Sequence, residues 1–339
     1  MRIGIAGNGM IVRRMLQDIK GISEIELSAI CVRAKSLEKG RALAEEFGIP
    51  AVDTDYRTFL EREDMDTVYI GIVNQMHYEY AKKALEAGKH VICEKPFTVT
   101  ACEAKELAAL ADEKGLFLWE AFKIPYSPVF QAVKRHLGEI GAVKMVQCNY
   151  SRISSRYRQY EQGIVLPAFD PACSGGCLYD INLYNLHFVT GLFGRPEEVD
   201  YYANLGFNGV DTSGTAVLKY GNFLGICNGA KDSSSPCGAL IQGTKGWIRI
   251  EGPVSSAARA EITVDGEQRL LAEDPAPGTL TGEMAEFAGQ FHRKDWSSCR
   301  EMMKHTVMMM EILENAAGQR GILSTEACLT GAGKEWKTV

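Results

Sequence analysis

The feature that most limits the fold is an alternation of short apolar runs and longer helical patterns over the first 120 or so residues. β-rich runs separated by helices of ten or more residues predict a parallel sheet covered by helices on both faces. We therefore expect an α/β domain with a doubly wound parallel sheet over residues 1–120. The predicted strands are 2–6, 26–32, 67–73, 89–93 and 116–119, and the predicted helices are 10–20, 36–47, 76–88 and 99–115.

The pattern changes after residue 121, where strands begin to follow one another without helices between them. Turns such as Tyr220-Gly221-Asn222 join these strands and indicate antiparallel pairing. We expect a second α/β domain over residues 121–339, with a large mixed or antiparallel open sheet. Its predicted helices are 127–138, 178–190, 280–293 and 298–318, and its predicted strands are 143–151, 197–205, 212–220, 223–230, 237–242, 246–251, 260–264 and 268–272.

Composition excludes several classes of function. The formal net charge of -6 gives no basic surface for nucleic acid. No apolar run reaches the roughly 18 residues that a membrane-spanning helix needs. The chain enters its first strand directly, without a signal-peptide pattern, so we expect a cytoplasmic protein. Ten scattered cysteines without a histidine cluster predict reduced thiols and no structural metal.

A glycine-containing turn follows the first predicted strand, with the sequence Gly7-Asn8-Gly9-Met10-Ile11. The first glycine permits a tight turn, and the second lets the backbone approach a pyrophosphate at a helix N-terminus. Val12 replaces the third glycine of the usual pattern. At the first βα junction this turn predicts a dinucleotide site, and the alternative is a plain structural turn.

The end of the second predicted strand indicates which dinucleotide is bound. An acidic residue there would favour NAD, but the segment carries Arg33, Lys35 and Ser36 instead. Such groups can bind a 2′-phosphate, so we expect NAD(P) with a preference for NADP. The alternative is a solvated basic pair.

Two clusters carry candidate catalytic groups. Lys95 lies between Glu94 and Pro96 at the end of a predicted strand, where its amine can donate to a substrate oxygen or stabilise negative charge. Asp180, Tyr184 and His187 fall at i, i+4 and i+7 of a predicted helix, on one face. An acid, a phenol and an imidazole suit proton transfer. The alternatives are an ion pair of Lys95 with Glu94, and a capping aspartate with two partly buried polar side chains.

The glycine turn, the segment from Ala84 to Pro96 and the run from Gly175 to His187 together resemble the Gfo/Idh/MocA oxidoreductases. The resemblance implies a Rossmann domain followed by an α/β domain with an open sheet, bound NAD(P), and sugar or cyclitol substrates. It also implies a homodimer or homotetramer, with substrate binding and oligomerisation assigned to the second domain.

The resemblance further implies roles for individual residues. Lys95 is similar to the catalytic or proton-relay lysine of the family, with Glu94 beside the nicotinamide. Asp180 is similar to an active-site aspartate. Tyr184 stands where many members have histidine, as in the branch of dimeric dihydrodiol dehydrogenases and anhydrofructose reductases. The cofactor-side loop corresponds to Val73, Asn74 and His77, although His77 could also cap the following helix.

Substrate contacts are expected from two places. Asn182 and His187 replace a glycine and an aspartate of the family pattern. The segment 150–158 includes Arg156 and Tyr157 among other arginines, hydroxyls and aromatics, which suits a polyol or an anionic substituent. A solvated loop is the alternative.

The expected reaction is reversible hydride transfer between a nicotinamide and a carbinol carbon of a sugar-like substrate. Tyr184 would be the general acid or base, with Lys95 and Asp180 tuning its pKa. This predicts the Lys95 amine within a few ångströms of the Tyr184 hydroxyl, in a cleft between the domains. Two alternatives stay open: a redox-neutral, glycoside-cleaving enzyme with retained NAD, and a non-catalytic regulator of a sugar pathway.

Overall fold

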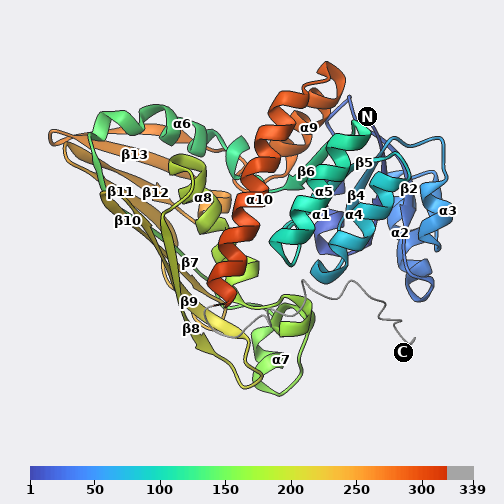
Figure 1. Cartoon of the computed structure of the whole chain (residues 1–339), viewed down its shortest axis with the longest axis horizontal. Coiled ribbons are helices and arrows are strands. Elements are labelled where there is room, and N and C mark those ends of the chain that lie inside the picture. The colour runs from blue at the N-terminus through green and yellow to red at the C-terminus, as the bar shows by residue number, and fades with distance from the viewer. Residues whose placement is uncertain (319–339) are drawn as a thin grey trace.

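The computed structural model describes residues 1–318; the end of the predicted second domain and Cys328 lie outside the described residues. Six parallel strands form the first sheet, in the spatial order β3-β2-β1-β4-β5-β6 (Figure 1). The order reverses between β1 and β4, and in such sheets ligands bind outside the carboxyl ends of the strands at this point. The strands are β1 (Arg2–Ala6), β2 (Glu26–Cys31), β3 (Ala51–Asp53), β4 (Thr67–Ile70), β5 (His90–Glu94) and β6 (Leu118–Ala121).

Helices between these strands bury apolar stripes against the sheet, as the alternation of patterns predicts. They are α1 (Met10–Asp18), α2 (Leu37–Phe47), α3 (Tyr56–Leu60), α4 (His77–Glu86) and α5 (Ala101–Lys114). The sequence prediction missed β3 and α3, which are three and five residues long. It also extended the fourth strand to residue 73, whereas β4 ends at Ile70.

The second sheet has eight strands in the order β14-β13-β12-β11-β7-β10-β9-β8. Its one parallel pair joins β10 to β7, and the other neighbours are antiparallel. The expected mixed open sheet is therefore confirmed. Its strands are β7 (Val143–Ser151), β8 (Glu198–Leu205), β9 (Asp211–Tyr220), β10 (Phe223–Ala230), β11 (Gly238–Gly243), β12 (Gly246–Glu251), β13 (Arg259–Val264) and β14 (Glu267–Glu273).

Helices cover the face of the second sheet that looks toward the first, and the opposite face is left open (Figure 1). The remaining helices are α6 (Pro128–His136), α7 (Tyr157–Glu161), α8 (Leu183–Phe193), α9 (Thr281–Arg293) and α10 (Trp296–Gly318). α10 runs between the sheets and contacts α5, α8 and β8 (Figure 1). Several of its methionines pack in the core, among them Met309, which is 0% exposed, and Met310, which is 1% exposed.

α9 returns to the first sheet although it follows the second in the chain. Met284 and Phe287 join the core cluster that contains Ile3 and Ile5. The indole of Trp119 on β6 donates to Gln290 Oε1 of α9 at 2.8 Å. The division at residue 120 stays a prediction, and the two sheets share helices across it. Within residues 1–318, no helix has both the length and the apolar character to cross a bilayer.

Candidate active site

Gly7 lies in a turn whose backbone conformation and close packing exclude a side chain. Its φ is +113°, which side chains rarely adopt. A Cβ there would lie 2.3 Å from the carbonyl oxygen of Gly71, just after β4. The Gly7 N–H donates to the carbonyl oxygen of Cys31 at 2.9 Å and ties the ends of β1 and β2 together. The turn therefore lies at the carboxyl edge of the sheet, where its order reverses.

The N-terminus of α1 is free of side-chain partners. Gly9 is its N-cap, with no capping side chain and no acidic residue in the first turn. A Cβ on Gly9 would have only the Gly71 carbonyl oxygen nearby, at 4.0 Å. The Asn8 amide nitrogen is buried and has no hydrogen-bond partner among residues 1–318. Unpaired N–H groups, the positive helix end and an open side all suit an anionic group such as a pyrophosphate.

Gly71, which follows the neighbouring strand β4, compensates for the absence of the third glycine. Val12 is fully buried in α1. A Cβ on Gly71 would lie 2.6 Å from Val12 Cγ2. Close packing of helix and sheet is the usual purpose of the third glycine, and here Gly71 provides the space. The sequence prediction did not identify Gly71.

Arg33, Lys35 and Ser36 follow β2 at the same edge. Arg33 is the N-cap of a short 3₁₀ turn, Ala34–Ser36. Both basic side chains are exposed and Ser36 is half-buried. Neither Arg33 nor Lys35 forms an ion pair within the described part of the chain.

The side chain of His77 connects the loop after β4 to the loop after β5. Nδ1 of His77 donates to the carbonyl oxygen of Pro96 at 2.9 Å, and its Nε2 lies 3.3 Å from that of Ile72. His77 is 0% exposed, and burial lowers its pKa. The expected cofactor contact through His77 is therefore wrong: a fully buried ring with two main-chain partners braces the loops instead. Asn74 donates to the carbonyl oxygen of Ser174 at 3.3 Å, whereas Val73 is 42% exposed.

Lys95, Asp180 and Tyr184 come together. Nζ of Lys95 donates to the Asp180 carbonyl oxygen at 2.9 Å and to its Oδ1 at 3.2 Å. The same nitrogen lies 4.9 Å from the centre of the Tyr184 ring. Lys95 follows β5, whereas Asp180 and Tyr184 belong to the second half of the chain, so the cluster joins the two sheets. The peptide bond between Lys95 and Pro96 is cis.

Glu94 lies beneath this cluster at the end of β5. It is 6% exposed and accepts a hydrogen bond from Tyr69 OH at 2.5 Å. Burial raises the pKa of Glu94, and the Tyr69 hydrogen bond and Lys95 act against that rise. Glu94 is thus a buried carboxyl group next to Lys95 in the chain.

Asp180 lies on a π-turn, Leu178–Asn182, rather than on a regular helix. This turn is anchored by Asp211, whose Oδ2 accepts from the Leu178 N–H and the Tyr201 hydroxyl, each at 2.6 Å. The anchor requires a glycine beside it: Gly176 has φ +113°, and a Cβ there would lie 1.9 Å from Asp211 Oδ1. The sequence prediction missed Asp211 because it is distant in the chain from the motif it supports.

Burial contradicts two expected substrate contacts, those of Asn182 and His187, and the π-turn breaks the i, i+4, i+7 stripe that included His187. Asn182 is 0% exposed, and its amide donates to the carbonyl oxygen of Cys227 at 2.9 Å. His187 is 1% exposed, stacks on Phe122 at 4.2 Å and lies 3.1 Å from His305 Nε2. Both side chains are part of the protein core and cannot reach a ligand beside Lys95 and Tyr184 without losing these partners.

Asp180 has a second cationic partner. Nζ of Lys231, which follows β10, lies 2.9 Å from Asp180 Oδ2. The Lys231 side chain is 2% exposed, against 16% for Lys95. No motif contains Lys231, so sequence reasoning had no signal for it.

The two lysines set the charge state of the cluster. Burial opposes ionisation of Asp180, but Lys95 and Lys231 outweigh it and hold the pKa of Asp180 well below its usual range. Burial also opposes the charge on Lys95, but Tyr184, Asp180 and Glu94 raise the pKa of Lys95 well above its usual value. Burial raises the pKa of Tyr184 well above that of a free phenol, although Lys95 acts against the rise. Near neutral pH the cluster therefore holds two ammonium groups, a carboxylate and a protonated phenol.

Arg156 and Tyr157 lie beside this cluster rather than in it. Tyr157 opens α7 and its ring lies 5.8 Å from that of Phe169. Nζ of Lys231 lies 4.4 Å from the Phe169 ring centre, so the aromatic group borders the Asp180 site. Arg156 is half-buried at the N-cap of α7. In residues 1–318, no group of three or more His, Cys, Asp or Glu side chains is arranged to hold a metal ion.

The anchoring role of Asp211 predicts a pH dependence of stability. Burial raises the pKa of Asp211 to about 6, and its hydrogen bonds from Tyr201 and Leu178 oppose the rise. Between the unfolded pKa near 3.8 and about 6, the folded protein binds more protons than the unfolded one. Stability should then fall as pH rises through this window, by on the order of 2–3 kcal/mol. Asp211→Asn should remove this loss. Denaturant unfolding at pH 4 to 7 measures it, and parallel curves for the two proteins would contradict it.

Comparison with known proteins agrees with this geometry. Residues 1–122 match the model for the oxidoreductase family with an NAD-binding Rossmann fold, and residues 130–249 match the GFO/IDH/MocA C-terminal domain. The chain is 32% identical to scyllo-inositol 2-dehydrogenase (NADP(+)) IolU of Bacillus subtilis (strain 168), over 95% of this chain and 98% of that protein. It is 30% identical to trans-1,2-dihydrobenzene-1,2-diol dehydrogenase of Xenopus tropicalis, over 78% and 79% of the two chains.

Two solved structures share the fold. KijD10, a 3-ketoreductase from Actinomadura kijaniata in complex with NADP and TDP-benzene, aligns with a TM-score of 0.79 at 24% identity, covering 94% of this chain and 97% of that one. Levoglucosan dehydrogenase, in complex with NADH and levoglucosan, aligns with a TM-score of 0.79 at 18% identity, covering 94% and 98%. Together with the matches above, these findings place the chain in the GFO/IDH/MocA family of oxidoreductases.

Proposed function

We propose that this enzyme reversibly transfers hydride between the nicotinamide of NAD(P) and a carbinol or carbonyl carbon of a sugar, cyclitol or related polyol. The observation that carries the proposal is the Lys95–Asp180–Tyr184 cluster, whose lysine follows β5 at the same carboxyl edge of the first sheet as the nucleotide turn after β1. The relatives support the substrate class, because their names include an inositol dehydrogenase and a levoglucosan dehydrogenase.

The cofactor site has three parts in this proposal. The turn and the start of α1 hold the pyrophosphate, the segment after β2 meets the adenine ribose, and the loops after β4 and β5 flank the nicotinamide. When bound there, the nicotinamide carries the hydride. The proposed contacts are Gly7, Asn8, Gly9, Met10, Ile11, Arg33, Lys35, Ser36, Val73, Asn74, Glu94 and Lys95.

Tyr184 is the proposed general acid and base toward the substrate oxygen. In reduction its hydroxyl donates a proton to the oxygen that becomes the alcohol, and in oxidation its phenolate accepts that proton. Burial alone would make the phenolate costly, and the Lys95 ammonium near the ring stabilises it. Asp180 keeps Lys95 charged and fixes its position. Proton transfer of this kind contributes about 10²–10⁴-fold to a rate.

Arg156 and Tyr157 are the proposed substrate-side groups of the second half of the chain. Their loop joins β7 to the segment that carries the π-turn, and Tyr157 contacts Phe169, whose ring faces Lys231 beside Asp180. A guanidinium and a phenol suit hydroxyl groups or an anionic substituent. We assign cofactor binding to residues 1–120 and substrate binding to the domain beyond. The same proposal places the enzyme in the cytoplasm, in keeping with nine free cysteines among residues 1–318.

A panel of sugars, cyclitols and polyols, assayed separately with NAD and NADP, tests the reaction. We expect net reduction of cofactor with at least one substrate. Lys95→Met should lower turnover by about 10²-fold or more, because it removes the cation beside Tyr184. Affinity for the nucleotide, followed by reduced-cofactor fluorescence, should change little. The matched control is Lys83→Met, which removes an exposed lysine paired with Glu79 on α4.

The outcomes of this assay separate the alternatives. Product release from a glycoside without net change in cofactor would indicate the redox-neutral lyase route. Nucleotide binding with no turnover of any substrate would indicate the regulator. Full turnover by Lys95→Met would contradict the proposed role of the lysine.

We further propose that NADP is the preferred cofactor, through contacts of Arg33 and Lys35 with the 2′-phosphate. Two exposed cations follow β2, where NAD-specific sites place an acid, and neither has an ion-pair partner in the described part of the chain. The Arg33→Ala/Lys35→Ala double variant should raise the KM for NADP about tenfold or more, because it removes charge-assisted hydrogen bonds. The KM for NAD should change less than about threefold on the same ground. Equal effects on both cofactors would count against a 2′-phosphate contact.

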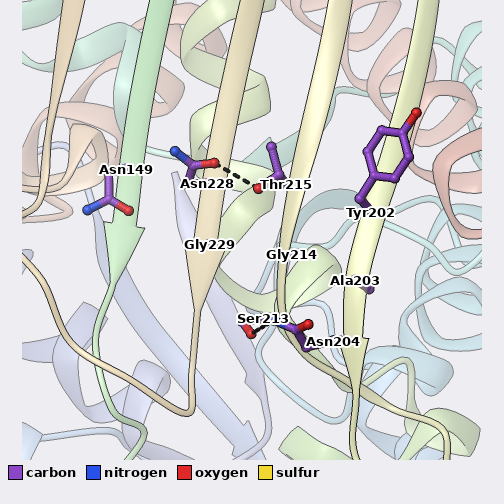
Figure 2. A pocket seen from close by; sticks show the side chains of 9 residues that line it. All are labelled: Asn149, Tyr202, Ala203, Asn204, Ser213, Gly214, Thr215, Asn228 and Gly229. Atoms are coloured by element: carbon purple, nitrogen blue, oxygen red, sulfur yellow. Dashed lines mark hydrogen bonds between the residues drawn. The ribbon is translucent and has the colours of Figure 1, made fainter.

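The open face of the second sheet is the proposed surface for a homodimer or homotetramer. Leu224 on the central strand β10 is 41% exposed, and Tyr202 on β8 is 60% exposed. Tyr202 lines a hollow of about 620 Å³ on this sheet (Figure 2), together with amide and hydroxyl side chains such as Asn149, Asn228 and Thr215. A bare central strand with an exposed leucine is typical of a surface that a second copy covers.

Light scattering coupled to size-exclusion chromatography tests the assembly. We expect a mass of at least twice the 37.3 kDa of one chain. Leu224→Glu should shift it toward the monomer, because a carboxylate would be buried in the interface. Asp265→Ser in the exposed turn between β13 and β14 is the control. A monomer at micromolar concentration would contradict the proposal.

A further inference from the structure

Lys231 is a buried lysine that neither the motifs nor the proposed mechanism uses. The residue is 1% exposed, so its ammonium group is out of contact with bulk water. Lysine is almost never buried unless it is paired. The partner of the Lys231 ammonium is the carboxylate of Asp180, whose Oδ2 lies 2.9 Å from the lysine nitrogen.

Three acceptors surround the Lys231 ammonium, one for each of its protons. They are the carbonyl oxygen of Ala168 at 2.6 Å, the carbonyl oxygen of Gly176 at 3.3 Å, and Oδ2 of Asp180. The Phe169 ring lies on a further side, with its centre 4.4 Å away. A fully coordinated ammonium group cannot turn toward a substrate, so its influence must pass through these partners.

The Asp180 carboxylate is divided between two lysines. Lys95 binds Oδ1 at 3.2 Å, and Lys231 binds Oδ2 at 2.9 Å. Because each oxygen has its own cation, the carboxylate plane is fixed in rotation. Lys95 cannot draw the carboxylate toward itself without lengthening the contact with Lys231. Lys95 also keeps its bond to the Asp180 carbonyl oxygen, at 2.9 Å.

We infer that Lys231 is a positioning residue, which holds Asp180 so that Lys95 stays beside the Tyr184 ring. This inference rests on the proposed function. Without Lys231, one carboxylate oxygen loses its cation, and the carboxylate is free to rotate onto Lys95 and neutralise it. The Lys95 ammonium would then stabilise the Tyr184 phenolate less.

The charged and titratable groups around Asp180 come from several elements. Lys95 follows β5, Lys231 follows β10, Tyr184 lies on α8 and Tyr150 lies on β7. Tyr150 lies near enough to Lys95 and Asp180 for their charges to act on its hydroxyl. Of these groups, the two lysines carry the positive charge that keeps Asp180 ionised.

Four variants test the inference: Lys231→Met, Asp180→Asn, their combination, and Lys89→Met. Lys89 is the matched control, since its ammonium donates to the carbonyl oxygens of Arg62 and Met65, on the opposite edge of the first sheet from the cluster. Lys231→Met should lower kcat about tenfold or more. Its nucleotide Kd should change less than about threefold, since the lysine lies outside the proposed cofactor site. Lys89→Met should leave kcat unchanged.

The double variant distinguishes a positioning role of Lys231 through Asp180 from a general structural role. If Lys231 acts through the carboxylate, Lys231→Met should have no further effect on single-turnover rates once Asp180→Asn is present. Independent, multiplicative losses would overturn the inference. The pH profile gives a second readout, because removing a cation raises the pKa of a neighbouring acid. Lys231→Met should show an acidic limb at higher pH than the wild type, and a parallel profile would also overturn the inference.

An infrared titration decides the matter without any substrate. The difference spectrum between each protein and its Asp180→Asn counterpart follows protonation of the Asp180 carboxylate. The midpoint should move to higher pH in Lys231→Met and stay unchanged in Lys89→Met. An unmoved midpoint overturns the role of Lys231. A wild type that titrates as expected but turns over no polyol would instead count against the proposed function.

Discussion

The ion pair between Lys95 and Asp180 is the contact on which the site depends, because it joins groups that are 85 residues apart in the chain. Lys95 follows strand β5 of the parallel sheet, whereas Asp180 belongs to the second half of the molecule. The Lys95 side chain is 16% exposed and that of Asp180 38%, so the pair is partly removed from water and costs a desolvation penalty, which Coulomb attraction offsets only with good geometry and further hydrogen bonds. Both conditions are met, by the Asp180 carbonyl oxygen on one side and by Lys231 on the other.

Other contacts keep the two halves aligned so that the pair can form. α10 packs on α5 of the first half and on α8 and β8 of the second. Asn74 reaches the carbonyl oxygen of Ser174, and the side chain of Asp18 at the end of α1 accepts from the Leu280 N–H at 2.9 Å. The geometry of the Lys95–Asp180–Tyr184 cluster is therefore set by packing between the halves as much as by its own hydrogen bonds.

Sequence patterns were sufficient where a long element carried its own periodicity. The alternating first half and the run of strands in the second correspond to the two observed sheets, because apolar periodicity reports burial directly. Elements of three to five residues, such as β3 and α3, have too few positions to show a period. The π-turn at Leu178–Asn182 was read as ordinary helix, which made His187 seem to share a face with Asp180. Gly71, Asp211 and Lys231 were missed for another reason. Each acts on a motif that lies more than 30 residues away in the chain, so only the folded structure brings them together.

The electrostatics of the cluster explain how a phenol with a raised pKa can serve as an acid and a base. Burial disfavours the Tyr184 phenolate, which keeps the proton available for donation to a substrate oxygen. The reverse step needs the phenolate. The Lys95 ammonium, 4.9 Å from the ring centre, lowers its cost, whereas the carboxyl groups of Glu94 and Asp180 act against it. With Lys95 as its only cation, the Asp180 carboxylate could turn toward that ammonium and weaken its effect on the phenol. Lys231, 2.9 Å from Asp180 Oδ2, therefore acts on the phenol through the carboxylate that it holds, and the carboxylate between the two ammonium groups offsets their mutual repulsion.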